Sequence, residues 1–118
     1  MKGGDRIRED GGVSRLDRYL RTLGDERRRH LLYYLSDNPS ATVDELAREV
    51  AARDTDRATS AVSEEECDRM RAKLHHEHLP RLRDYGIVDY DERNRDVRLV
   101  DRSQVLLMLL QVCRFIEE

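Results

Sequence analysis

The hydrophobic periodicity of this chain changes twice, and this order restricts the folds available to it. From position 14 to about 85 the apolar residues recur at the three- and four-residue spacing of amphipathic helices. Two short stretches then alternate apolar and polar residues, and their apolar members are Val88 and Tyr90, then Val97 and Leu99. The polar run 91–96 between them predicts a β-hairpin with a charged tip. Apolar residues are dense again from 105 to 116, as in a buried helix. The whole pattern predicts a mainly α-helical fold with one small β-hairpin.

Helix-capping signals divide the helical part of the chain. Four residues that favour the N-cap position precede apolar-periodic stretches: Ser14, Asp25, Thr42 and Ser63. The last two are each followed three residues later by glutamate, which completes a capping box. Gly24 and Pro39 end the first two helices, and the small polar segment 54–61 is predicted to be a loop. Pro80 lies within the last of these helices and predicts a kink or boundary there, because proline removes a backbone donor and presses on the carbonyl four residues earlier.

The chain is long enough for one domain and leaves little room for a second. Residues 1–13, rich in glycine and charge, are predicted to be a flexible tail, and residues 14–101 a single folded domain. Residues 102–118 are predicted to form a separate apolar helix. Its two polar interruptions, Gln111 and Arg114, leave apolar side chains on all sides. Such a helix must be buried from most directions, so we expect a homodimer formed through Leu106, Leu109, Leu110 and Cys113.

The run His78-Leu79-Pro80-Arg81-Leu82-Arg83-Asp84-Tyr85-Gly86-Ile87-Val88 resembles the end of the recognition helix and the start of the wing in ArsR-type regulators. In that family a His-Leu pair, a leucine three positions later and an aliphatic-rich Gly-Leu-Val run lead into the wing. Here His78-Leu79, Leu82 and Gly86-Ile87-Val88 stand at matching spacing. The paired-cysteine metal motif of ArsR-type sensors is missing, so metal sensing is not implied and no cofactor is predicted.

Three further segments resemble small winged-helix domains of unknown function from haloarchaea: Asp25–Leu35, Val43–Ala47 and Leu74–Pro80. This resemblance covers roughly residues 16 to 100. The chain has 20 arginines and only two lysines, a bias that fits a halophilic archaeal source and also fits GC-rich codons. The resemblance implies a winged helix-turn-helix domain that binds double-stranded DNA and controls transcription in the cytoplasm.

The predicted DNA contacts follow from that fold. If the stripe of Cys67, Met70, Leu74, His78 and Leu82 faces the core, the outward face of the recognition helix offers Arg69, Lys73, His76 and Arg81. The wing adds Arg93 and Arg95 at its tip and Arg98 on the returning strand. The charge in this region is nearly balanced, with five basic against six acidic residues over 63–85. We therefore keep a second hypothesis, a winged-helix module that binds proteins and not DNA.

Other functions find less support in the sequence. No phosphate-binding glycine loop, nucleophile elbow or carboxylate pair in an apolar pocket is present, so an enzyme is not expected. The group of His75, His76, His78, Glu77 and Cys67 suggests metal ligands, but Pro80 stands where a His-Glu-x-x-His motif needs its second histidine. The run 27–29 of three arginines is interpreted as a solvated, ion-paired helix face more readily than as a phosphate site. No apolar stretch is long enough to cross a membrane and no secretory signal is visible, so a soluble cytoplasmic protein is expected.

Overall fold

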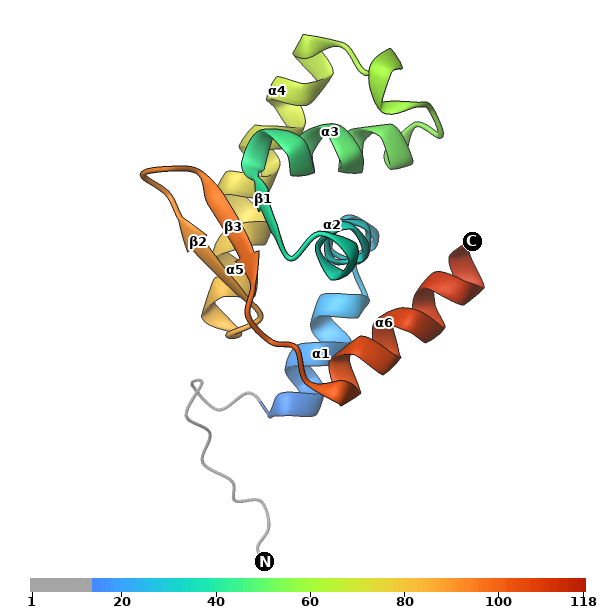
Figure 1. Ribbon diagram of the computed structural model, residues 1–118, viewed down its shortest axis with the longest axis vertical. Helices are drawn as coiled ribbons and strands as arrows, with labels where there is room; N and C mark the ends of the chain where they lie inside the picture. Colours follow the sequence, from blue (N-terminus) through green and yellow to red (C-terminus); the bar gives the residue numbers. More distant parts are fainter. Residues whose placement is uncertain (1–13) are drawn as a thin grey trace, which may run out of the picture.

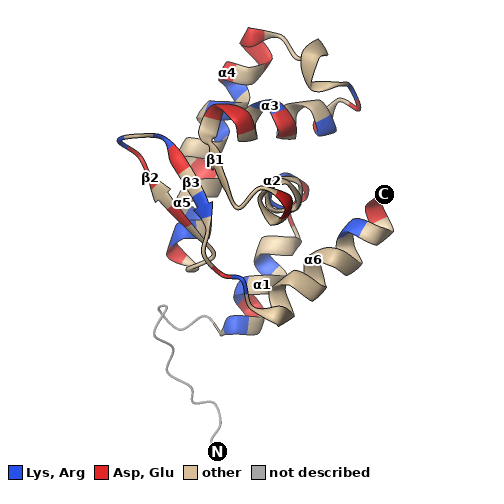
Figure 2. Ribbon diagram, in the orientation of Figure 1, with Lys and Arg blue, Asp and Glu red and all other residues tan. Residues whose placement is uncertain are grey.

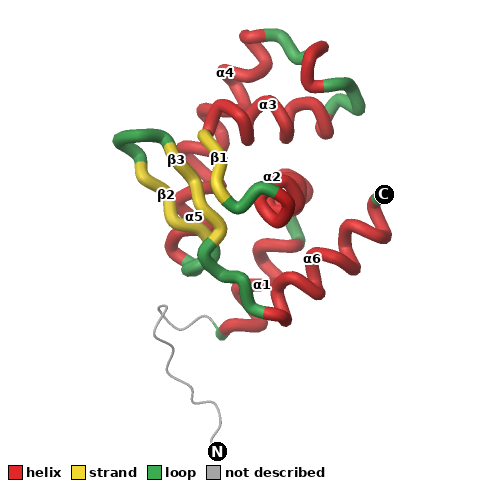
Figure 3. Tube along the Cα trace, viewed as in Figure 1, coloured by secondary structure: helices red, strands yellow, loops and turns green. Residues whose placement is uncertain are grey.

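The computed structural model describes residues 14–118, and the predicted tail 1–13 lies outside them. It is mainly helical with one small antiparallel sheet, as the sequence predicts (Figures 1 and 3). In chain order the elements are α1 (Arg15–Leu23), α2 (Glu26–Asp37), β1 (Ser40–Thr42), α3 (Val43–Asp54), a 3₁₀ turn (Thr59–Ala61), α4 (Glu64–Lys73), a π turn (Leu74–His78), α5 (Leu79–Asp84), β2 (Val88–Asp91), β3 (Asp96–Leu99) and α6 (Gln104–Glu117). Helix α2 lies at the centre, in contact with α1, α3, β3 and α6.

The helices start where their capping residues predict. Ser14, Asp25, Thr42 and Ser63 each hold an N-cap with extended backbone, and each side chain accepts from a backbone N–H of the first turn. The capping boxes at Thr42 and Ser63 are complete, since Glu45 and Glu66 also accept from the N-cap backbone. These local bonds satisfy backbone N–H groups that have no partner within the helix in its first turn. The predicted starts of these four helices are therefore confirmed.

The sheet contains one strand more than predicted. Strands β2 and β3 form the predicted hairpin, with Val88 opposite Leu99 and Tyr90 opposite Val97, and all four of these side chains are buried. Strand β1 pairs antiparallel with the other edge of β3, giving the order β1-β3-β2. It has three residues, too few for an alternating pattern to be recognised in the sequence. Through β1 the hairpin is attached to the start of α3.

The boundary predicted at Pro80 is present, because a π turn ends at His78 and α5 begins at Leu79 with Pro80 in its first turn. The N–H of Leu79 bonds to the carbonyl of Leu74, five residues earlier. Widening the helix immediately before Pro80 relieves the pressure of its ring on the preceding turn. The buried residues Leu74, His78 and Leu82 are spaced four apart, a spacing that drifts by about 40° per step on a regular α-helix. The wider turn reduces that drift, so this stripe stays against the core.

Helix α6 belongs to the same core as the preceding elements. Leu106 and Leu110 are 0% and 2% exposed, and α6 contacts α1 and α2. Leu109 and Cys113 are partly buried against that core. This corrects the expectation that all four face a second protomer, because Leu106 and Leu110 are already enclosed within their own chain. The periodicity could not tell these faces apart, since apolar residues surround the helix. In the described part of the chain, residues 14–118, no helix is both long and apolar enough to cross a membrane.

Candidate nucleic-acid interface

The segment α4–α5, predicted to be the recognition helix, is fixed at its N-terminus by Ser63. The Ser63 hydroxyl accepts from the Glu66 N–H at 3.1 Å, and the Glu66 carboxylate accepts from the Ser63 N–H at 3.0 Å. The backbone N–H of Ser63, and then the guanidinium of Arg57, lower the pKa of Glu66 to about 2. The first turn also contains Glu64 and Glu65, so the segment starts with three carboxylates.

The seven predicted DNA-contacting side chains are all exposed, and they lie on two neighbouring parts of the fold. Those on the helical segment are Arg69, Lys73, His76 and Arg81, and those on the hairpin are Arg93, Arg95 and Arg98. A hydrogen bond of 2.6 Å between His75 Nδ1 and the Tyr90 hydroxyl ties the segment to β2. The sequence singles out His75 as a metal-ligand candidate and Tyr90 as an apolar position of the hairpin, but it does not pair them, because nothing in the sequence connects positions 15 residues apart on different elements.

Three of the seven predicted DNA-contacting residues line two separate clefts. Arg69 and Lys73 line a cleft of about 150 Å³ that they share with residues of α2 and α3, among them Arg27 and Asp54. Arg95 lines a larger cleft of about 360 Å³ between α4 and the hairpin. The other residues lining this larger cleft are Val43, Asp68, Arg71, Ala72, His75, Tyr90 and Glu92.

Ion pairs separate the basic side chains into engaged and free groups. Arg71 bonds to Asp44 and Asp68, Arg83 to Glu92 and Arg98 to Asp89. Arg81 donates to the Tyr85 hydroxyl at 3.4 Å. Within residues 14–118, no ion pair is formed by Arg69, Lys73, Arg93 or Arg95. These four are therefore the cations of the helix and hairpin that are available to an external anion. Figure 2 shows basic and acidic positions interleaved along both elements.

The hairpin tip presents its arginines from an ordered turn. The Asp91 carboxylate accepts from the backbone N–H groups of Arg93 and Asn94 at 3.0 and 3.3 Å. Arg95 has a φ of 61°, in the left-handed region, and its carbonyl accepts from the N–H of Val43 at 3.0 Å. The tip is thus bonded to the first residue of α3, and Arg95 is held at the larger cleft.

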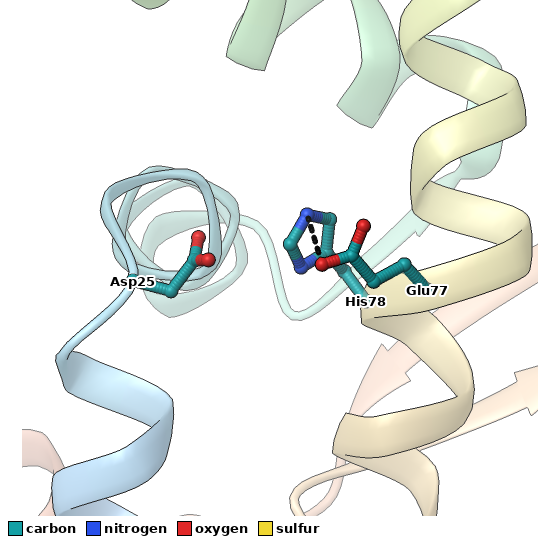
Figure 4. A group of neighbouring side chains, drawn as sticks. All are labelled: Asp25, Glu77 and His78. Carbon is teal, nitrogen blue, oxygen red and sulfur yellow. Dashed lines mark ion pairs between the residues drawn. The ribbon is translucent and has the colours of Figure 1, made fainter.

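Below the surface, the predicted recognition helix is connected to α2 by a buried polar pair. Arg28 Nε donates to His78 Nδ1 at 3.1 Å, and the two residues are 8% and 2% exposed. The second guanidinium arm of Arg28 reaches the carbonyl of Arg21 at 3.3 Å. Figure 4 shows His78 extending from the α4–α5 segment towards α2, with Glu77 beside it.

The grouping of Asp25, Glu77 and His78 is one of two sets in residues 14–118 whose ligand atoms are close enough to share a cation. One ring nitrogen of His78 already accepts from Arg28, and one carboxylate oxygen of Asp25 accepts from the N–H groups of Arg27 and Arg28. We therefore interpret this set as structural. The sequence-based grouping around His75, His76 and Cys67 is not brought together in either set.

The two buried histidines predict that stability falls on acidification. Burial lowers the pKa of His78 and of His30 from the ordinary value, so both are neutral in the folded chain. The unfolded chain binds more protons as the pH falls through about 6.5, and the free energy of unfolding then decreases by at most about 1.4 kcal/mol per pH unit for each histidine. Thermal unfolding between pH 8 and pH 5.5 should show this decline.

The variant His78→Gln tests the contribution of His78, because it keeps an acceptor for Arg28 but cannot titrate. Its stability should depend less steeply on pH than that of the wild type. The matched control is His76→Gln, since His76 is exposed. Equal slopes in all three proteins would contradict the assignment of a neutral buried His78.

Comparison with known proteins gives one match. A family model described as a domain of unknown function (DUF7344) matches residues 20–98. Neither the curated proteins nor the solved structures contain a match to the chain. The matched span runs from the second half of α1 to β3, close to the extent of the resemblance seen in the sequence, and it leaves α6 outside. The ArsR-type and haloarchaeal resemblance itself stays a prediction. Because the match covers most of the chain, this protein belongs to the DUF7344 family.

Proposed function

We propose that residues 14–101 form a winged helix-turn-helix domain that binds double-stranded DNA as a homodimer and regulates transcription. In this proposal α3 and the α4–α5 segment are the two helices of the helix-turn-helix, and β2 and β3 are the wing. Their order along the chain and the packing of α3 on α4 support the assignment. The arginine bias fits a halophilic archaeal source, as it also fits GC-rich codons, and a cytoplasmic location is part of the proposal.

The observation that carries the proposal is the set of unpaired cations. Arg69 and Lys73 on the helix and Arg93 and Arg95 at the wing tip are exposed and free of ion pairs within residues 14–118, whereas Arg71, Arg83 and Arg98 nearby are engaged. Phosphate contacts position a protein on a duplex and need such free donors. Arg69, Lys73, Arg93 and Arg95 are then candidates for phosphate contacts, and His76 and Arg81 on the outward face of the helix for the major groove. Arg98 reaches the backbone only if it exchanges Asp89 for a phosphate.

The near-neutral charge of this face predicts a particular mode of binding. Glu64 and Glu66 are paired with Arg48 and Arg57, which reduces the repulsion of phosphate by the start of α4. A face without a large positive excess gains little from counterion release, so affinity depends on a few direct contacts. Such binding loses less affinity when salt is raised than binding through a strongly basic surface.

The test begins with selection of bound duplexes from a random library at low and at molar salt. The double variant Arg69→Ala/Lys73→Ala is then compared with the wild type on the selected duplex. If both side chains contact phosphates, the slope of log K against log salt should become shallower by about 1.8, since each contact contributes about 0.9. The matched control is Arg102→Ala, an exposed arginine on the loop between β3 and α6, at the opposite end of β3 from the wing tip. Its slope should not change.

A second candidate function is supported by the carboxylates at the start of α4. A winged helix that docks on a protein has no need to keep acidic groups away from phosphate, and the first turn of α4 contains Glu64, Glu65 and Glu66. If a folded preparation selects no duplex between low and molar salt, DNA binding is refuted and the protein-interaction module is the better description.

A further inference from the structure

Helix α6 has two apolar faces, and the fold covers one of them. Leu106 and Leu110 face the core of the protomer. Val105, Met108, Val112 and Phe115 follow a spacing of three, four and three residues, and their exposed fractions are 48%, 57%, 57% and 85%. We call these four residues, together with the adjoining Ile116, the outer seam. A three-four spacing is that of the contact positions of paired helices.

The outer seam has no charged residue of its own. Arg114, on another side of the helix, donates to Asp37 on α2 at 2.9 Å. Glu117 accepts from both arms of Arg29 and from the Tyr33 hydroxyl, and Glu118 pairs with Arg53. Figure 2 shows α6 free of charge along almost its whole length. The charged groups near its C-terminus are therefore engaged within the protomer, and an apolar partner can approach the seam without burying an unpaired charge.

The apolar area is close to what a stable homodimer buries. The five side chains of the outer seam expose on the order of 400 Å² if each has about 100 to 200 Å² in total. A standard interface buries about 800 Å² on each partner, and in homodimers about 65% of it is apolar, or about 500 Å². An apolar patch of this size is as large as the largest on a typical monomer, and such patches often have a function.

We propose that the outer seam pairs with the outer seam of a second copy of this chain. An uncharged face with contact-position spacing is complementary to itself, which is the condition for a two-fold symmetric interface. The interface therefore consists of Val105, Met108, Val112, Phe115 and Ile116, with Leu109 at its edge, and excludes Leu106 and Leu110. Only the purpose of the dimer, which is to present two recognition helices to one duplex, rests on the proposed function.

The test compares two variants that add the same charge at adjacent positions of α6. Val112→Glu places a carboxylate in the outer seam, and Gln111→Glu places it on the exposed polar side. Sedimentation at tens of micromolar should give the wild type and Gln111→Glu twice the chain mass of 13.9 kDa, and Val112→Glu the mass of one chain. Circular dichroism should show the same helix content in all three, because residue 112 does not contribute to the protomer core.

If Val112→Glu does not fold, Phe115→Ser provides the same test, since Phe115 is the most exposed side chain of the seam. A monomeric wild type, or a fully dimeric Val112→Glu or Phe115→Ser, overturns the proposal. The duplex selection described above is independent of these results. A dimer that binds no DNA refutes DNA binding and leaves the interface standing. A monomer that binds DNA refutes the interface and the homodimeric form of the proposed function, but not DNA binding itself.

Discussion

Replacing Leu106 by alanine should lower the free energy of unfolding by about 2 to 5 kcal/mol. The Leu106 side chain is fully buried where α6 meets the core, so its removal leaves a cavity among neighbours that cannot close it completely. For a chain of this size the loss corresponds to a fall in Tm of roughly 10 to 20 °C. Urea or thermal unfolding at one fixed protein concentration measures it.

The matched control is Gln111→Ala, five residues further along the same helix. Gln111 is exposed, so its truncation should change the free energy of unfolding by no more than about 0.5 kcal/mol. A loss of less than about 1 kcal/mol for Leu106→Ala would mean that α6 is not anchored as the structure shows. The comparison also separates the two faces of α6, because the Leu106 effect should persist in the monomeric Val112→Glu protein.

Replacing His78 by leucine should cost about 1 to 3 kcal/mol, since it leaves the buried guanidinium of Arg28 without one of its acceptors. Arg28 would keep only the bond to the carbonyl of Arg21, at 3.3 Å. The double variant Arg28→Met/His78→Leu should recover most of the loss, because apolar side chains of similar volume then fill the site without an unpaired polar group.

A double-mutant cycle by urea unfolding tests this pair. A coupling energy of about 1 to 3 kcal/mol between Arg28 and His78 is expected. Effects of the two single variants that simply add in the double variant would contradict a direct interaction. The cycle measures the one buried hydrogen bond between side chains of α2 and the α4–α5 segment found in the described residues.

The parts of the fold that the sequence predicts correctly depend on local signals. Capping boxes fix helix starts within four residues of chain, and the alternation at Val88, Tyr90, Val97 and Leu99 specifies a hairpin because strands have a period of two. Strand β1 was not predicted because three residues are too few to show an alternating pattern. Which face of α6 packs on the core could not be predicted, because the sequence of a helix that is apolar on all sides does not distinguish one face from another.

The candidate site was predictable only in outline. Exposure of Arg69, Lys73, Arg93 and Arg95 follows from their places relative to the apolar stripe and the hairpin tip. The sequence does not show which of these cations are free of ion pairs. An ion pair such as Arg71–Asp44 joins residues 27 positions apart on different elements. The same is true of the bond between Arg28 and His78, which spans 50 positions. Such pairs are determined by tertiary packing.

The wing is fastened to the helices at several points. The Val43–Arg95 bond and the Arg83–Glu92 ion pair hold its tip, and the His75–Tyr90 bond holds β2. The surface that holds the free arginines is therefore assembled before any partner arrives, and little conformational entropy remains to be lost on binding. A rigid surface of this kind cannot adapt its shape to a duplex. The duplex would have to bend or change its groove width to fit, so base steps that deform easily should be favoured even where no side chain touches them.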